Sequence, residues 1–181
     1  MARHISKQQQ VKNLLSDLEK AINRNNVDIA LPLLEWTKEK IDLSYREKTR
    51  VDKYNQTKKT QGKPRFVKRG GVYYANLGKN VGSEQNGYRP VLVVQEKRAN
   101  TTSPTVIVIP LTDAHDKQGN PKRVLDSHLV VTHPKLSKVS MVKAEYARSI
   151  SKNRLRDFIC QLDPKVMSDV DIRMKRALQL T

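Results

Sequence analysis

The chain has 181 residues, and 35 lysines and arginines against 18 acidic residues give it a net charge of +17, a field that attracts polyanions such as nucleic acid. The single cysteine, Cys160, excludes an intramolecular disulfide and a multi-cysteine zinc site, and the four histidines lack ligand spacings such as HExxH, so we expect no metal and no other cofactor. No run approaches eighteen apolar residues and the N-terminus lacks the apolar segment of a signal peptide, so we expect a soluble, cytoplasmic protein that binds nucleic acid and no membrane.

Two helices are predicted in the first sixty residues. Ser6 and Gln9 have the spacing of a capping box, and an apolar stripe at helical spacing follows: Val11, Leu14, Leu15, Leu18, Ala21 and Ile22. The polar residues 23–26 end this helix. Proline is tolerated in a first helical turn, so Pro32 predicts that a second helix starts near Leu31. The two helices most simply pair as a hairpin.

Residues 46–69 carry ten basic and only two acidic side chains and almost no apolar ones. We interpret them as the frayed end of the second helix followed by a linker, either a solvated connector or a contact for a phosphate backbone. The predicted domains are therefore 1–60, a helical extension with a basic linker, and 61–181. Their net charges are +5 and +12, which makes the second domain the candidate for binding nucleic acid.

After Gly70 the pattern becomes that of short strands. They are rich in β-branched and aromatic residues and are separated by Gly, Asn, Pro and Asp: residues 72–77, 90–94, 105–112, 128–131, 140–148 and 158–162. Asp163 as N-cap and Pro164 at the first helical position then open a closing helix that should pack on the sheet. The predicted fold class is α+β: a small antiparallel, β-barrel-like sheet with a C-terminal helix, preceded by a helical hairpin.

The segment VGSEQNGYRP, residues 81–90, is a polar loop that runs into an apolar strand. It contains an acid, amides, hydroxyls and an arginine at one edge of the predicted sheet. Loops of this composition on a rigid strand are where a small domain usually keeps its chemistry, although an ordinary hairpin connection has a similar composition.

Three ordered blocks of the sequence resemble the MazF/PemK family of toxin endoribonucleases: RGGVYYANL at 69–77, VGSEQNGYRPVLVVQ at 81–95, and a segment from SPT at 103–105 to PLT at 110–112. The helix after residue 163 resembles the family's closing segment, so the resemblance covers about residues 66–180. It implies a homodimer that cleaves single-stranded RNA and an antitoxin that masks the site. By position in the family's motifs, Arg89 and Thr112 are the implied catalytic residues. Ser83, Glu84 and Gln85 fall on the loop that, in this family, contacts RNA and antitoxin.

The chemistry of metal-free RNA cleavage suits these residues. The ribose 2′-OH is the nucleophile, so a site has to remove its proton, stabilise charge on the phosphorane and help the 5′-oxygen leave. Arg89 suits charge stabilisation because a guanidinium is planar and bidentate towards phosphate oxygens, and Thr112 can donate its hydroxyl to a non-bridging oxygen. Glu84 is the loop's only carboxylate and the candidate general base; a contact with a base edge or an outward solvated side chain is the alternative. A mechanism with two histidines, His128 and His133, is a further alternative.

The sequence therefore predicts the toxin of a type II toxin–antitoxin pair, a metal-independent, sequence-selective endoribonuclease that leaves a 2′,3′-cyclic phosphate on its RNA substrate. Ser83, Gln85, Asn86 and Tyr88 are the predicted RNA-binding residues, and Tyr88 is the one placed to stack on a base. The expected partners are single-stranded RNA, a second copy of the chain and an antitoxin with an acidic tail. The alternative is a non-catalytic protein of the same fold that binds nucleic acid or gyrase.

Overall fold

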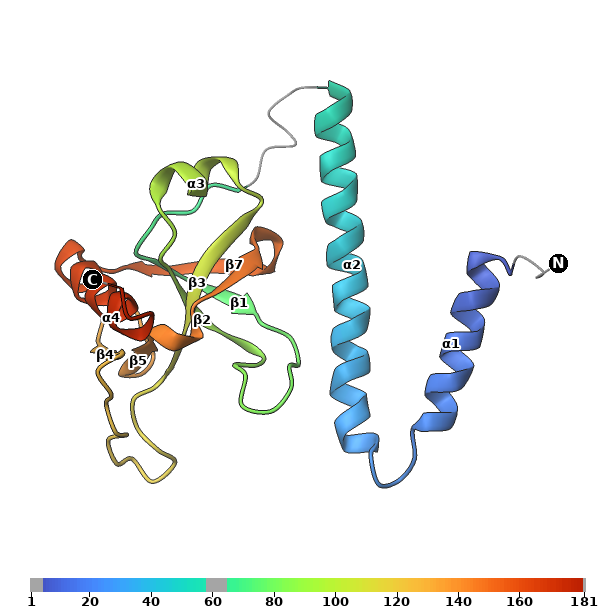
Figure 1. Cartoon of the computed structure of the whole chain (residues 1–181), viewed down its shortest axis with the longest axis horizontal. Coiled ribbons are helices and arrows are strands. Elements are labelled where there is room, and N and C mark those ends of the chain that lie inside the picture. The colour runs from blue at the N-terminus through green and yellow to red at the C-terminus, as the bar shows by residue number, and fades with distance from the viewer. Residues whose placement is uncertain (1–4, 58–64, 181) are drawn as a thin grey trace. The chain divides into compact units, whose positions relative to one another are not determined.

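The computed structural model describes residues 5–57 and 65–180 and divides the chain into two compact units, one up to Asp42 and the other from Leu43. The predicted domain boundary at 60/61 lies outside the described residues. Two helices come first, α1 (Lys7–Ala21) and α2 (Val27–Thr57), and the strands and short helices follow (Figure 1). None of the helices in the described ranges combines the length and apolar composition that a membrane crossing needs.

The first helix begins as the sequence predicts. The hydroxyl of Ser6 accepts a hydrogen bond from the backbone N–H of Gln9 at 3.2 Å, which caps the helix. The reciprocal half of the capping box is not formed, because the side chain of Gln9 donates to Asn13 instead. No residue of α1 is buried in the described structure, so its apolar stripe is uncovered.

The second helix is longer than predicted at both ends. It starts at Val27, so Pro32 lies inside it rather than in its first turn, and it continues to Thr57 through the basic stretch that we expected to fray. Helix-forming lysine, arginine and glutamate residues explain the extension, since basic side chains do not oppose a helix when they point into water. Within the second unit, the carboxylate of Glu47 accepts hydrogen bonds from Arg50 and from Asn153.

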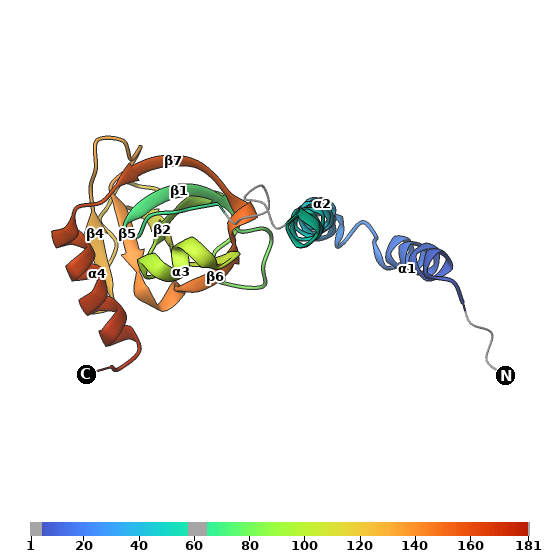
Figure 2. The same ribbon diagram turned by 90° about the horizontal axis from the view of Figure 1, so that it is seen from above.

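The sheet is antiparallel throughout, in the order β4-β5-β3-β2-β1-β7, with β6 paired to β3. Figure 2 shows it curled rather than flat, as predicted for a barrel-like sheet. The strands are β1 (Gly71–Asn76), β2 (Tyr88–Val93), β3 (Thr105–Asp113), β4 (His128–Val131), β5 (Ser140–Lys143), β6 (Arg148–Ser151) and β7 (Leu155–Gln161). A short helix, α3 (Lys97–Thr102), which the sequence analysis missed, joins β2 to β3.

The predicted single strand at 140–148 is wrong. A 3-10 turn, η2 (Ala144–Tyr146), interrupts it, so β5 and β6 pair with successive parts of β3. Another 3-10 turn, η3 (Lys152–Arg154), joins β6 to β7. The partners of β3 therefore change along its length, and Leu111–Asp113 pair with β5 beyond the end of the ladder with β2.

Two apolar clusters hold the second unit together. One lies on one face of the sheet, and its members include Tyr73, Val91, Val93 and Ile150. The other lies on the opposite face, where Met167 and Val170 of α4 (Pro164–Ala177) pack against the strands, as predicted for the closing helix. Strand residues alternate between faces, so the cluster to which a strand residue belongs shows the side of the sheet to which its neighbours in the adjoining loop point.

Candidate functional site

The loop between β1 and β2 has a fixed base. Gly87 accepts a hydrogen bond from the N–H of Leu77 and donates its own N–H to Gly78, both at 2.8 Å. Gly78 and Gly87 have φ values of 75° and 72°, a conformation that side chains disfavour, so glycine is required for this closure. Strand β2 starts at the next residue and its first side chains are therefore held in place.

Asn80 ties the rest of the loop together. Its side-chain amide donates to the carbonyl oxygens of Leu77 and Gln85, at 3.2 and 2.9 Å, and its backbone N–H donates to Oδ1 of Asn86 at 2.6 Å. The sequence analysis did not identify Asn80. Asparagine is common in loops for many local reasons, so the residue type alone did not indicate this role.

Arg89 is half-buried at the start of β2 and is held by this loop. Its Nε donates to the carbonyl oxygen of Asn86 at 2.7 Å, and its Nη1 donates to Oε1 of Gln85. Burial lowers the pKa of the Arg89 guanidinium because desolvation disfavours its charged form. An arginine pKa so far above neutrality leaves the group charged in neutral solution even after lowering. Arg89 is thus a fixed cation.

Thr112 lies on β3 just beyond the end of the ladder with β2. The last pair of that ladder is Val91 with Pro110; Arg89 lies two residues before Val91, and Thr112 lies two residues after Pro110. Because strand residues alternate, Arg89 points to the same face of β2 as Val91, and Thr112 to the same face of β3 as Pro110. The Thr112 hydroxyl donates only a long bond, 3.4 Å, to the carbonyl oxygen of Met141 on β5. A hydroxyl held this weakly can turn towards a ligand.

The predicted RNA-binding residues of the loop divide into two groups. Ser83 and Glu84 are exposed at its tip, and the Glu84 carboxylate has no hydrogen bond within the described residues. Gln85 and Asn86 are half-buried and turned towards Arg89 and Asn80, as their hydrogen bonds show. In this structure they position the arginine; their contacts with RNA stay predictions.

Tyr88 is exposed and stacks on Tyr74 of β1, with ring centroids 5.0 Å apart and ring planes 6° apart. Tyr73 points to the other face, is buried and packs edge-on against Phe158.

Polar residues directly after Thr112 were missed. Asp113 accepts a hydrogen bond from the backbone N–H of His115 at 2.9 Å and lies 3.0 Å from Nζ of Lys138. That backbone bond, and next the bond with Lys138, lower the pKa of the Asp113 carboxyl. The His115 Nδ1 is 3.8 Å from the same carboxylate. An ionised acid and an imidazole therefore follow the strand end that holds Thr112.

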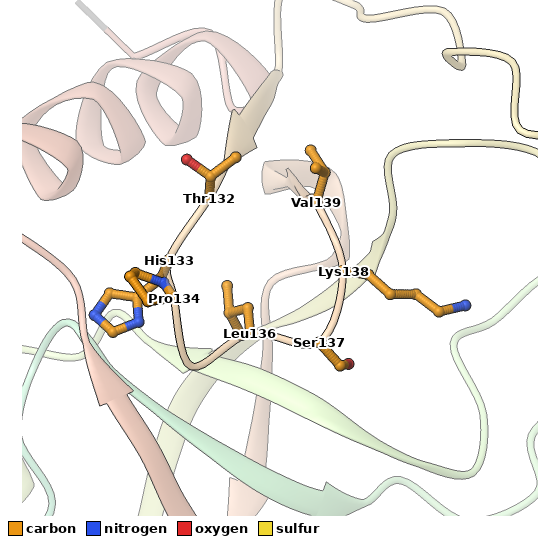
Figure 3. A pocket seen from close by; sticks show the side chains of 7 residues that line it. All are labelled: Thr132, His133, Pro134, Leu136, Ser137, Lys138 and Val139. Carbon is orange, nitrogen blue, oxygen red and sulfur yellow. The ribbon is translucent and has the colours of Figure 1, made fainter.

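The two histidines of the alternative mechanism have structural contacts. His128 is buried: its Nδ1 accepts the N–H of Leu125 at 3.2 Å, which leaves Nε2 to donate to Glu145 at 2.7 Å. His133 lies in the loop between β4 and β5, whose side chains line a pocket of about 400 Å³ (Figure 3). Its Nδ1 accepts the N–H of Lys135. Neither histidine is hydrogen-bonded to Arg89 or Thr112 in the described structure.

The chain was compared with solved structures. MazF (Form-I) from Deinococcus radiodurans matches with a TM-score of 0.53 at 19% identity, over 64% of this chain and 99% of that one. An endoribonuclease in complex with its cognate antitoxin, from a mycobacterial species, matches with a TM-score of 0.52 at 22% identity, over 64% and 97%. These similarities show the fold, and both leave more than a third of this chain uncovered.

Sequence comparisons go further. Endoribonuclease EndoA of Bacillus subtilis (strain 168) is 40% identical over 115 residues, which are 64% of this chain and 97% of that protein. Endoribonuclease MazF of Staphylococcus saprophyticus is 38% identical over 106 residues, 59% of this chain and 86% of that protein. Residues 68–178 match the family described as PemK-like, MazF-like toxin of type II toxin-antitoxin system. The sheet, its closing helix, and the loop and strand end that hold Arg89 and Thr112 all lie within that match, so this chain belongs to the PemK-like, MazF-like family of type II toxins.

Proposed function

We propose that the protein is the toxin of a type II toxin–antitoxin pair and a metal-independent, sequence-selective endoribonuclease that cleaves single-stranded mRNA. The ribose 2′-OH attacks the adjacent phosphorus, the bond to the 5′-oxygen breaks, and the products carry a 2′,3′-cyclic phosphate and a 5′-hydroxyl. The observation that supports this proposal best is the fixed Arg89 guanidinium, in a chain 40% identical to a protein named an endoribonuclease.

Arg89 stabilises the charge that develops on the phosphorane oxygens. Asn86 and Gln85 take up Nε and Nη1, so the guanidinium is oriented before substrate arrives. A cation oriented in advance contributes more to the transition state than a mobile one, because nothing has to reorganise during the reaction. Half-burial strengthens the effect by reducing the screening by water.

Thr112 donates its hydroxyl to a non-bridging phosphate oxygen. To do so it exchanges the 3.4 Å bond to Met141 for a shorter one to the substrate. Removing one such donor typically costs about 2.7–4 kcal/mol of transition-state stabilisation. The position at the end of β3 keeps the hydroxyl on a rigid element.

Glu84 is the proposed general base that takes the 2′-OH proton. Its carboxylate is exposed at the loop tip and carries no competing hydrogen bond in the described structure, so it is available to a bound ribose. Efficient proton transfer requires hydrogen-bond distance between this carboxylate and the 2′-OH in the complex with RNA.

The proposed partners follow from the site and from the relatives. A second copy of the chain completes a homodimer in the cytoplasm, and an antitoxin with an acidic tail covers the cationic loop. Charge supports the antitoxin, since residues 61–181 carry +12 and an acidic segment complements them. One mycobacterial relative in fold is described in complex with its cognate antitoxin.

Incubation of the purified protein with a long single-stranded RNA in EDTA tests the proposal. We expect discrete cuts, with a cyclic phosphate at each new 3′ end, and loss of cutting in Arg89→Ala and Thr112→Ala with the fold intact. Absence of discrete cuts, or loss on chelation, refutes a metal-free nuclease. RNA binding without cleavage supports the alternative of a non-catalytic protein that binds nucleic acid.

A further inference from the structure

Tyr74 and Tyr88 form a stacked pair beside the site. Burial of apolar surface does not explain why the two rings stack. Tyr88 is 56% exposed, yet its ring lies parallel to that of Tyr74 with a 6° angle between the planes. Neither phenol hydroxyl has a hydrogen-bond partner within residues 5–57 and 65–180. Tyr74 covers one face of the Tyr88 ring, and the exposure of Tyr88 leaves the other face to solvent.

The pair is held rigidly by the two strands. Asn76 pairs with Tyr88 and Tyr74 pairs with Pro90, so the two tyrosines are diagonal neighbours on one face of the β1–β2 ladder. Tyr88 directly follows Gly87, whose N–H and C=O are both hydrogen-bonded at the base of the loop. An aromatic ring fixed in this way is ready to stack without further ordering.

The position of the pair relative to Arg89 determines which part of a substrate it meets. Tyr88 and Arg89 are consecutive in β2, so their side chains leave opposite faces of the strand. The ladder with β3 ends at Val91, so no partner strand covers this edge of β2 at residues 88–90. A nucleic-acid strand that crosses the free edge brings a phosphate to Arg89 and the base of a neighbouring nucleotide to Tyr88.

We propose that Tyr74 and Tyr88 form a stacking platform for one unpaired nucleobase next to the cleaved bond. The base lies on the outer face of Tyr88, which Tyr74 supports from behind. Aromatic rings bind unpaired bases in this manner and do so with little sequence preference, because every base has a π-face. The platform selects for single-stranded substrate, and the hydrogen-bonding groups of the loop carry sequence selection. The inference rests on the proposed function, since it assigns an RNA subsite beside the proposed catalytic residues.

A structural role is the competing explanation, because cross-strand aromatic pairs also stabilise sheets. The chain offers a matched control in Tyr73 and Phe158, an aromatic pair between β1 and β7 in which Phe158 is 50% exposed. Replacing Phe158 by leucine disturbs a second aromatic pair of the same sheet. If stability alone mattered, Tyr88→Leu and Phe158→Leu would affect RNA binding equally.

The test measures binding of a fluorescein-labelled, mixed-sequence single-stranded RNA with 2′-O-methyl riboses, which lack the nucleophile and cannot be cut. We expect Tyr88→Leu to weaken binding about tenfold, Tyr74→Leu to weaken it less, and Phe158→Leu to leave it unchanged. Tyr88→Phe, which keeps the ring, should bind more tightly than Tyr88→Leu. Binding of the same RNA as a duplex should not change in any variant. In a uridine strand with one 2-aminopurine, quenching of its fluorescence on binding should disappear in Tyr88→Leu.

Two results would overturn the platform: wild-type affinity in Tyr88→Leu, or equal weakening in Tyr88→Leu and Phe158→Leu. If Tyr74→Leu fails to fold, as shown by circular dichroism, the exposed Tyr88 variants decide the question alone. Cleavage assays on unmodified RNA separate this failure from that of the proposed function. A wild-type protein that cuts while Tyr88→Leu binds normally refutes the platform only, and a wild-type protein that cuts no RNA refutes the proposed nuclease.

Discussion

The contributions of the charge of Arg89 and of the geometry of its guanidinium can be tested separately. We predict that Arg89→Lys lowers kcat for RNA cleavage by about 100-fold, because a lysine keeps the charge but loses the bonds from Nε and Nη1 to Asn86 and Gln85. Cleavage of a defined RNA by Arg89→Lys, with Arg123→Lys as the exposed control, measures this loss. Activity near that of the wild type would mean that only the charge matters.

Glu84 can be tested by removing its carboxylate. Glu84→Gln should lose about 100-fold or more in the rate of cleavage, because an amide cannot take the 2′-OH proton. Cleavage rates of the two proteins on a defined RNA measure the effect. Wild-type activity in Glu84→Gln together with a loss in His115→Gln would transfer the role to the imidazole beside Asp113.

Asn80 allows a test of the whole loop, because its hydrogen bonds hold Gln85 through its carbonyl oxygen and Asn86 through its Oδ1. These are the two residues whose other oxygens accept from Arg89. We expect Asn80→Ala to lower kcat about tenfold with little change in KM or melting temperature, since displaced catalytic groups cost rate more than stability. Lys79→Ala, the exposed neighbour, is the control. A change of the same size in KM, with kcat unchanged, would show that the loop only binds substrate.

The strand elements show what the sequence could and could not predict. Runs of β-branched and aromatic residues located β1 to β5 and part of β7, and the motif residues located Arg89 and Thr112, because both signals are local. The break at Ala144–Tyr146 was missed, since a run of residues that favours strands does not reveal that β3 requires two successive partners. Asn80 was missed for the same reason: its role depends on oxygens brought near only by the closed loop.

The turn that breaks this strand also carries a pH prediction. Burial raises the pKa of Glu145, but hydrogen bonds from its own backbone and from His128 and Ser127 outweigh it, and the net pKa lies below its ordinary 4.5. A carboxyl group whose pKa is lower in the folded than in the unfolded protein stabilises the fold at pH values above its unfolded pKa. This stabilisation is lost as the pH falls through its folded pKa.

Near neutral pH, Glu145→Gln should therefore unfold at a lower urea concentration than the wild type. Its free energy of unfolding should be lower by about 1 kcal/mol or less, because Glu145 is partly exposed. The difference should shrink as pH falls below about 4.5. Urea melts across pH, with Glu19→Gln on the exposed face of α1 as control, measure it. A difference in stability that persists in acid would show that the shape of the side chain, rather than its charge, is the cause.

For the whole molecule, the open question is the role of the N-terminal extension. Oligomerisation, an additional RNA-binding arm and partial inhibition of the site are the three possibilities. Self-inhibition by charge mimicry is the weakest, because a segment that covers a cationic site should be acidic and residues 1–60 carry +5. The uncovered apolar stripe of α1 favours oligomerisation, since a short helix without packing is marginal in water.

We predict that a protein lacking residues 1–42 melts at the temperature of the full chain, because the unit from Leu43 onward has its own core. Its rate of RNA cleavage should not increase, and its mass in solution should fall by more than the deleted residues account for. Calorimetry, cleavage assays and light scattering on both proteins measure these quantities. Faster cleavage would instead identify an inhibitory segment. Unchanged assembly with weaker RNA binding and a shallower salt dependence would identify an RNA-binding arm, because each lost phosphate contact reduces that slope.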